Sequence, residues 1–225
     1  MFYDPTFILI IPALLLVLYA QFRVQSTFAK YSNVASSRGL TGAEVGRRLL
    51  DGAGLRSVPV QEVSGELTDH YDPRDKTLHL SKPVYGSNSV AAVGVVAHEV
   101  GHALQDAQAY APLAVRSNLV PAANLGSQLA IPLFFMGLLF SFPLLMDIGI
   151  IAFSLAVAFQ VITLPVEFNA SSRAIKILSD GGYLTGQEIP QARSVLNAAA
   201  LTYVAAMAMA VLNLIRLLAL RGRRD

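Results

Sequence analysis

The sequence contains no cysteine and no tryptophan, and charged residues make up only 14% of its 225 positions. Without cysteine the chain can form neither disulfides nor thiolate metal sites, so histidine and carboxylate side chains must bind any metal ion. The formal net charge of +2 is too small to indicate a nucleic-acid-binding protein. Hydrophobic residues reach 54% and the mean hydropathy is +0.51, so we expect a membrane protein and not an ordinary soluble domain.

Four apolar runs account for this hydrophobicity, and each is long enough to be considered a membrane span. They cover residues 5–22, 129–146, 148–166 and 196–220. Only Asp4 precedes the first run, whereas Arg23 and Lys30 follow it, which favours a retained helix with a cytoplasmic C-terminal end over a cleaved signal peptide. Little polar sequence separates the second run from the third, so we expect a tight transmembrane hairpin with Asp147 as a solvated turn residue near its tip.

The last apolar run presents a conflict, because Arg221, Arg223 and Arg224 follow it. If this run crosses from the cytoplasm, its three arginines lie outside, against the positive-inside tendency. Either the run crosses despite the rule, or it lies in the interface or packs on the other helices. We favour crossing.

Within the segment 23–128, residues 23–88 are polar and mixed in charge, as expected of a water-exposed domain, and residues 103–128 are expected to stay helical and modestly polar. Thr41 and Glu44 have the spacing of a capping box, which predicts a short helix from this point. Pro112 and Pro121 are expected to break the helical stretch that ends this segment.

A β-hairpin is expected where two segments with alternating polarity, 67–71 and 76–81, flank the turn sequence D-P-R-D. Its unpaired edge could bind an extended peptide through main-chain hydrogen bonds, or it could simply complete a small sheet. We interpret His70 and His79 as ordinary polar strand residues and not as metal ligands.

Residues 98–102 read H-E-x-x-H, and two of the four histidines in the chain fall within them. On a helix, His98 and His102 lie one turn apart on one face, where two neutral imidazoles can bind one Zn²⁺ at roughly 2.0–2.1 Å. Glu99 follows the first histidine and is placed to take a proton from a water molecule that zinc has made acidic. This motif predicts metal-dependent hydrolysis. The alternative is a helix that merely carries two surface histidines.

A catalytic zinc site uses three protein ligands and keeps one position open. The extended pattern H-E-x-x-H-x-x-G-x-x-H is absent, because Gln105 and Gln108 stand at its glycine and final histidine positions. A distant carboxylate must therefore complete the site. The candidates are Glu167, Asp180, Glu188 and Asp106.

We choose Glu167 because a hairpin between His102 and Glu167 returns the chain to the membrane face that it left. Pro165 is expected in the first turn of a helix that starts there, so Glu167 could alternatively be a helix-start residue favoured by the dipole. Asp180, in S-D-G-G, has the pattern of a helix end, and Glu188 belongs to a second capping box, T-G-Q-E.

Three stretches, SNSVAAVGVVAHEVGHALQD, LTDHYDPRDKTLHLS and LPVEFNASSRA, resemble the YugP-type neutral zinc metallopeptidases of bacterial membranes. The resemblance covers nearly the whole chain. It implies a multipass membrane zinc peptidase of gluzincin type, related in plan to HtpX and the prenyl-protein proteases. In these relatives the ligand glutamate begins an E-x-x-x-D pattern whose aspartate orients a zinc-binding histidine. Here Ser171 stands at that aspartate position, so the residue that orients His98 is not identified.

The sequence therefore predicts a mainly α membrane protein, in which transmembrane helices carry a small α+β zincin-like catalytic domain with a short β-hairpin. The expected segments are a first transmembrane helix (5–22), a zincin-like region with the H-E-x-x-H helix (23–128), a transmembrane hairpin (129–166), a third-ligand helical segment (167–195) and a C-terminal transmembrane or membrane-associated helix (196–220).

The expected activity is zinc-dependent peptide-bond hydrolysis, with His98, His102 and Glu167 as ligands of one Zn²⁺ and Glu99 as general base. We expect a protein or peptide substrate, contact with the lipid bilayer, no nucleic acid, and a multipass location in a bacterial cell membrane with the catalytic region facing the cytoplasm. Analogy with relatives suggests membrane-protein quality control. The candidates for oxyanion stabilisation are His70, Tyr85 and Arg173.

Two alternatives stay open. An intramembrane protease of the site-2 type would place H-E-x-x-H within a membrane span and take an aspartate from a D-G motif, for which Asp180 is a weak match. A catalytically silent membrane scaffold or zinc-binding adaptor would keep the fold without the reaction, although the intact Glu99 argues against it.

Overall fold

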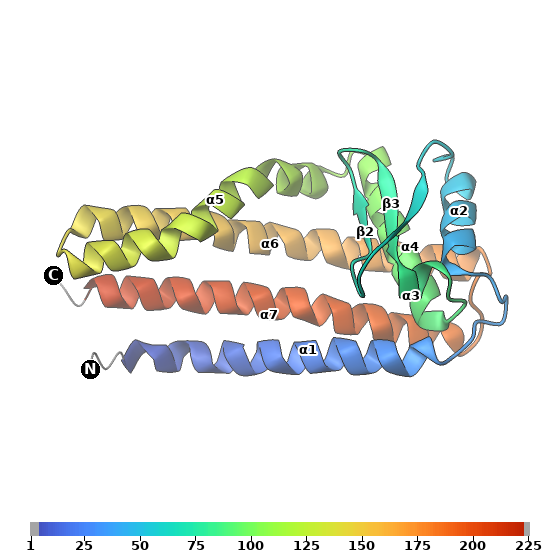
Figure 1. Ribbon diagram of the computed structural model, residues 1–225, viewed down its shortest axis with the longest axis horizontal. Helices are drawn as coiled ribbons and strands as arrows, with labels where there is room; N and C mark the ends of the chain where they lie inside the picture. The colour runs from blue at the N-terminus through green and yellow to red at the C-terminus, as the bar shows by residue number, and fades with distance from the viewer. Residues whose placement is uncertain (1–4, 223–225) are drawn as a thin grey trace. The chain divides into compact units, whose positions relative to one another are not determined.

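A computed structural model describes residues 5–222, and long helices dominate them (Figure 1). Four helices are long and apolar enough to cross a membrane, and one small sheet accompanies them. The predicted fold class, mainly α with a small α+β region, is confirmed. The described chain divides into two units, an apolar unit (5–21, 111–165 and 201–222) and a mixed unit (22–110 and 166–200).

The apolar unit contains the short 3-10 helix η1 (Pro5–Ile10) and four long helices. The long helices are α1 (Ile11–Ser32), α5 (Ala111–Leu139), α6 (Pro143–Asp180) and α7 (Glu188–Gly222). Three of these, α1, α6 and α7, continue into the mixed unit. The first apolar helix therefore extends ten residues beyond the predicted end at residue 22. Its last third is less apolar, with Arg23 and Lys30, but no proline or glycine interrupts it.

The predicted hairpin of apolar helices is formed by α5 and the first part of α6. The helices pack closely at Gly149, where an added Cβ would lie 2.8 Å from the carbonyl oxygen of Ala130. A small core of Phe134, Met146 and Leu217 joins α5, α6 and α7 within this unit. Small residues and tight packing are how apolar helices associate in lipid.

Three predictions about this region were wrong. Pro121 lies inside α5 and Pro165 lies inside α6, so neither proline interrupts its helix. The predicted break at Pro112 is present, because α4 ends at Ala107 and Pro112 lies in the first turn of α5. Apolar helices tolerate internal proline because neighbouring groups and local adjustments satisfy the freed backbone. Asp147 lies in α6 and not in the turn, and its carboxylate accepts a 2.8 Å hydrogen bond from Nε of Arg221.

The mixed unit contains the sheet and the shorter helices. They are α2 (Gly42–Gly52), β1 (Val60–Val63), β2 (His70–Asp72), β3 (Thr77–Ser81), α3 (Lys82–Tyr85) and α4 (Val90–Ala107). The capping box that begins α2 is confirmed, since the Thr41 hydroxyl accepts from the Glu44 N–H and the Glu44 carboxylate accepts from the Thr41 N–H. The predicted hairpin is confirmed as the antiparallel pair β2–β3.

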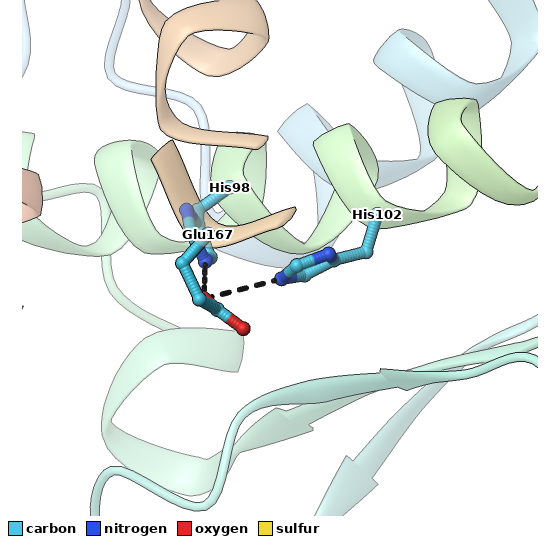
Figure 2. Close-up of side chains that lie close together, drawn as sticks. All are labelled: His98, His102 and Glu167. Atoms are coloured by element: carbon cyan, nitrogen blue, oxygen red, sulfur yellow. Dashed lines mark hydrogen bonds and ion pairs between the residues drawn. The ribbon is translucent and has the colours of Figure 1, made fainter. Parts of the chain in front are cut away.

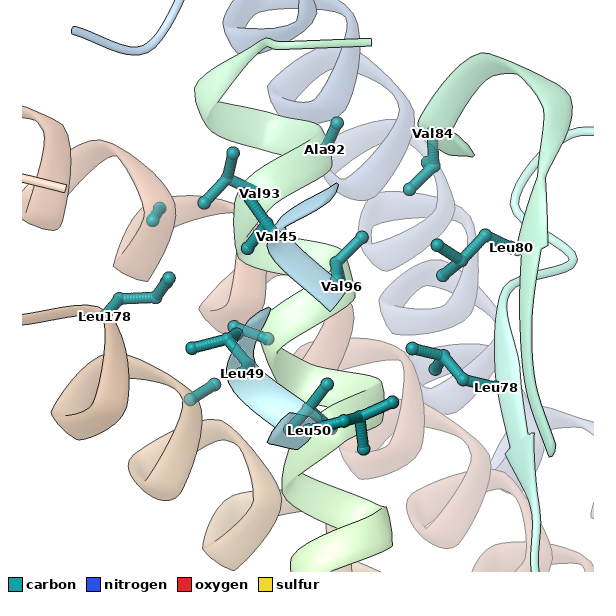
Figure 3. Close-up of a cluster of buried hydrophobic side chains, with 14 of the residues drawn as sticks. Val45, Leu49, Leu50, Leu78, Leu80, Val84, Ala92, Val93, Val96 and Leu178 are labelled. Atoms are coloured by element: carbon teal, nitrogen blue, oxygen red, sulfur yellow. The ribbon is translucent and has the colours of Figure 1, made fainter. Parts of the chain in front are cut away.

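The sheet has the order β1-β3-β2, with β1 parallel and β2 antiparallel to the central β3. Its inner face packs on α2 and α4 and forms the core of the mixed unit (Figure 3). Leu50, Leu80 and Val96 are fully buried there. This core fixes the orientation of α4, the helix that carries the H-E-x-x-H motif.

Candidate metal centre

Helix α4 presents both histidines of the motif on one face. Its first residue is Val90, and the Ser89 hydroxyl caps it by accepting from the Ala92 N–H. The helix continues without a break to Ala107. The His98 and His102 rings, four residues apart, have centroids 4.8 Å from each other and meet edge to face.

Glu167 reaches the two histidines from α6 (Figure 2). Its Oε2 lies 3.2 Å from Nε2 of His98 and 3.6 Å from Nε2 of His102, and its side chain is only 2% exposed. The approach of the two helices depends on Gly101, where an added Cβ would lie 2.7 Å from the carbonyl oxygen of Ala170. A side chain at this position would push α6, and with it Glu167, away from the imidazoles.

The donor atoms of these three residues fit a zinc ion. One nitrogen from each histidine and one carboxylate oxygen all lie within 4.8 Å of one another. Two ligand atoms bound at ~2.1 Å to a tetrahedral ion are roughly 3.4 Å apart, and the observed 3.2 and 3.6 Å lie on either side of that value. Two imidazoles and one carboxylate are also a ligand set that catalytic zinc sites use, with a fourth position left open.

Glu99 lies beside this cluster and contacts the sheet. It is 8% exposed, and its Oε2 accepts a 3.1 Å hydrogen bond from the Tyr71 N–H. Burial is the largest influence on Glu99 and raises the pKa of its carboxyl group above the ordinary value. Leu78, the partner of Tyr71 in β3, donates its own N–H to Pro59, next to β1. The Tyr71 N–H therefore belongs to the free edge of β2.

The other ring nitrogen of each histidine has its own partner. Nδ1 of His102 lies 2.9 Å from Oε1 of Gln105, and Nδ1 of His98 lies 3.2 Å from Oγ of Ser171. Ser171 thus contacts His98 from the position where the E-x-x-x-D pattern has its aspartate. Sequence reasoning missed the contact of Gln105, although its place three residues after His102 put it on the same helix face.

The three rejected third-ligand candidates have partners elsewhere. Asp106 accepts a hydrogen bond from the Tyr71 hydroxyl, Asp180 accepts one from Lys176, and Glu188 accepts from Ser37 and from the Thr185 N–H that precedes α7. Of the four candidates, Glu167 is the one that the structure places against both histidines. The predicted helix end at Asp180 is confirmed.

The remaining histidines and the oxyanion candidates are accounted for differently. His70 and His79 stack on each other across β2 and β3, with centroids 4.6 Å apart, as expected of polar strand residues. Arg173 donates hydrogen bonds to Asn169 and Gln108. Tyr85 ends α3.

Comparison with known proteins assigns the chain to a family. Residues 6–222 match the family described as "Putative neutral zinc metallopeptidase". The chain is 50% identical over 219 residues to a Bacillus subtilis (strain 168) protein named "Putative membrane protease YugP", an alignment that covers 96% of this chain and 97% of that protein. No solved structure matches the chain. The family match spans nearly the whole sequence, and the chain belongs to this family.

Proposed function

We propose that this protein is a membrane-bound zinc endopeptidase that hydrolyses peptide bonds. The observation that carries the proposal is the convergence of His98, His102 and Glu167 from two helices, with Glu99 directly beside them. In this proposal the first three residues bind Zn²⁺ and Glu99 is the general base. The family assignment and the membrane protease relative support it.

The ion, when bound, supplies Lewis acidity and makes water nucleophilic near neutral pH. Glu99 takes the proton of the attacking water on its carboxylate and then delivers it to the leaving amine. Its burial suits this role, because a raised carboxyl pKa brings the group closer to the pH at which it must both accept and release a proton. His98, His102 and Glu167 stay fixed during these steps, since all three are largely buried.

The substrate is proposed to bind as an extended strand along the free edge of β2. This edge carries the Tyr71 N–H that contacts Glu99, so a peptide paired with β2 would pass directly by the general base. The other edge of β2 is used by β3. Peptide segments close to the membrane surface fit this site, because α6 continues from the apolar unit directly into Glu167.

The structure favours this proposal over the site-2 alternative. Helix α4 is not among the four helices apolar and long enough to span a membrane. Asp180, which that alternative requires, forms an exposed ion pair with Lys176. We therefore propose a site at the water-exposed side of the membrane, on the face that the positive-inside tendency assigns to the cytoplasm.

The test is Glu99→Gln in the full-length protein purified in detergent, with an unfolded protein as substrate. Zinc content should stay at one ion per chain, while cleavage falls by ~10²–10⁴-fold because the general base is lost. Glu62→Gln, the same change on the exposed strand β1, is the matched control and should keep full activity. A chelator should abolish the wild-type activity and added zinc should restore it. Retained activity in Glu99→Gln, or chelator-resistant activity, would contradict the proposal and indicate another catalytic site. A wild-type protein that binds zinc but cleaves no substrate would contradict it too and would favour the silent-scaffold alternative.

A further inference from the structure

The side chain of Gln105 joins α4 to α6 beside the proposed zinc ligands. It is fully buried, and its Oε1 lies 2.9 Å from Nδ1 of His102. Its Nε2 donates to the carbonyl oxygen of Val166 at 2.8 Å and to Oδ1 of Asn169 at 3.0 Å. A glutamine amide offers two N–H donors and one oxygen acceptor to such partners, and all three are used here.

These contacts determine which nitrogen of His102 faces the cluster as an acceptor. The Val166 carbonyl can only accept, so the group next to it must be the NH₂ of Gln105. The amide oxygen of Gln105 then faces His102, and Nδ1 of His102 must carry the proton that it donates. Nε2, 3.6 Å from Glu167, is left with its lone pair directed at the shared site, which is the form that binds a metal ion.

The same amide also holds the backbone of the other ligand. Val166 directly precedes Glu167 in α6, so the hydrogen bond to its carbonyl fixes the helix turn from which Glu167 projects. Asn169 accepts a further hydrogen bond from Arg173, and Arg173 donates to Gln108 just after the end of α4. The network therefore leaves α4, crosses to α6 and returns to α4.

We propose that Gln105 is a positioning residue that sets His102 and Glu167 relative to each other before zinc binds. This inference rests on the proposed function of the three ligands. It assigns to a neutral amide the orienting role that a carboxylate often has in zinc sites. A carboxylate would not serve at this position, because it could not donate to the Val166 carbonyl and would face the oxygen of Asn169.

The test is zinc affinity measured on the zinc-free, full-length protein in detergent, by competition with a chromophoric chelator. Gln105→Leu keeps the volume and removes all three hydrogen bonds, and Gln105→Glu keeps the shape but loses the donors. Both should weaken Zn²⁺ binding by ~10–100-fold, the effect typical of losing an orienting partner. Gln61→Leu, the same exchange at an exposed position of β1 outside this network, is the control and should change the affinity by less than about 3-fold.

Thermal unfolding of the zinc-free variants separates positioning from simple helix-to-helix adhesion. Positioning predicts weakened zinc binding in a variant that still unfolds cooperatively near the wild-type temperature. Unchanged zinc affinity in Gln105→Leu would overturn the inference. If the wild type itself fails to bind zinc, the proposed function fails first, and the two failures are thereby distinguished.

A measurement on the wild-type protein covers the case in which both Gln105 variants unfold. The chain has four histidines, so selective ¹⁵N labelling gives a simple NMR spectrum. In the zinc-loaded protein we expect His102 to carry its proton on Nδ1, with Nε2 shifted by the metal. A metal-bound Nδ1 on His102 would contradict the inference regardless of how any variant behaves.

Discussion

The apolar unit and the mixed unit place their large hydrophobic side chains in opposite ways. In the apolar unit Leu139 and Ile151 are 76% and 66% exposed, whereas in the mixed unit Leu50 and Leu80 are fully buried. Exposed apolar helices are stable when lipid is their solvent, while a buried core is what water demands. This contrast is expected of one continuous chain, with α1, α6 and α7 passing through both units, whose apolar unit is in contact with lipid and whose mixed unit is in water.

The largest effect is expected at Glu167, a polar residue of the mixed unit in a helix that also belongs to the apolar unit. This carboxylate is buried at 2% exposure in a helix whose preceding half is apolar. Glu167→Ala removes one of three proposed ligands, so zinc affinity should fall by more than the ~100-fold that a supporting residue costs, and proteolysis should be lost. Asp180→Ala, at the exposed end of the same helix, is the control and should bind zinc as the wild type does. Equal zinc content in the two variants would show that Glu167 is not a ligand.

The next largest effect is on stability, and it differs between the buried core of the mixed unit and the exposed apolar surface of the apolar unit. Leu80→Ala should lower the free energy of unfolding of the mixed unit by ~2–5 kcal/mol, because it leaves a cavity in a closed core. Ile151→Ala, which truncates a side chain on the exposed surface of the apolar unit, should change it by about 0.5 kcal/mol or less. Pulse proteolysis in urea and detergent would measure both. Similar losses for the two variants would mean that the apolar unit is packed against protein and not against lipid.

A smaller effect is expected at the β2–β3 hairpin, which contacts α4 through Tyr71. The Tyr71 hydroxyl donates to Asp106 at 2.8 Å and so ties β2 to α4. Tyr71→Phe removes that bond, and because the Asp106 side chain is 27% exposed, water replaces part of it, so the cost should be about 1 kcal/mol. Faster hydrogen exchange at residues 70–72 would report it. Tyr183→Phe, in the turn between α6 and α7, is the control. If hydrogen exchange at residues 70–72 is the same in Tyr71→Phe as in the wild type, the Tyr71–Asp106 hydrogen bond does not hold β2 to α4.

The last effect is a gain in affinity and not a loss. Ser171→Asp would place a carboxylate where the hydroxyl now lies 3.2 Å from Nδ1 of His98. A carboxylate partner raises the basicity of a zinc-binding histidine, so zinc affinity should rise, by up to ~10-fold. Ser172→Asp, on the next and exposed position of α6, is the matched control for added charge. Weaker zinc binding in Ser171→Asp would show that Ser171 does not orient His98.

Local signals in the sequence predicted much of the mixed unit. The capping box of α2, the β2–β3 hairpin and the helix end at Asp180 follow from turn and cap chemistry within a few residues. The approach of Glu167 to the histidines followed from topology, because a membrane hairpin must bring the chain back to the same face. These features depend on interactions between residues close in the sequence, or on the requirement that a helical hairpin returns the chain to the face that it left.

The predictions that were wrong concern residues whose structure depends on an apolar environment or on contacts with distant parts of the chain. Pro121 was expected to break a helix and Pro165 to lie in the first turn of one, but both stand within continuous apolar helices. Asp147 appeared to be a turn residue because its partner, Arg221, is 74 residues away. Gln105 likewise contacts residues 61 and 64 positions away. Single-sequence patterns carry no information on such pairings, since they depend on how distant helices pack.

X-ray absorption at the zinc edge of the loaded wild-type protein tests the central claim most directly. The account predicts a four-coordinate ion with nitrogen and oxygen neighbours at ~2.0–2.2 Å and the multiple-scattering signal of two imidazoles, reduced to a weakly bound or absent ion in Glu167→Ala. A signal of three imidazoles, or the same coordination in Glu167→Ala, would contradict a site built from His98, His102 and Glu167.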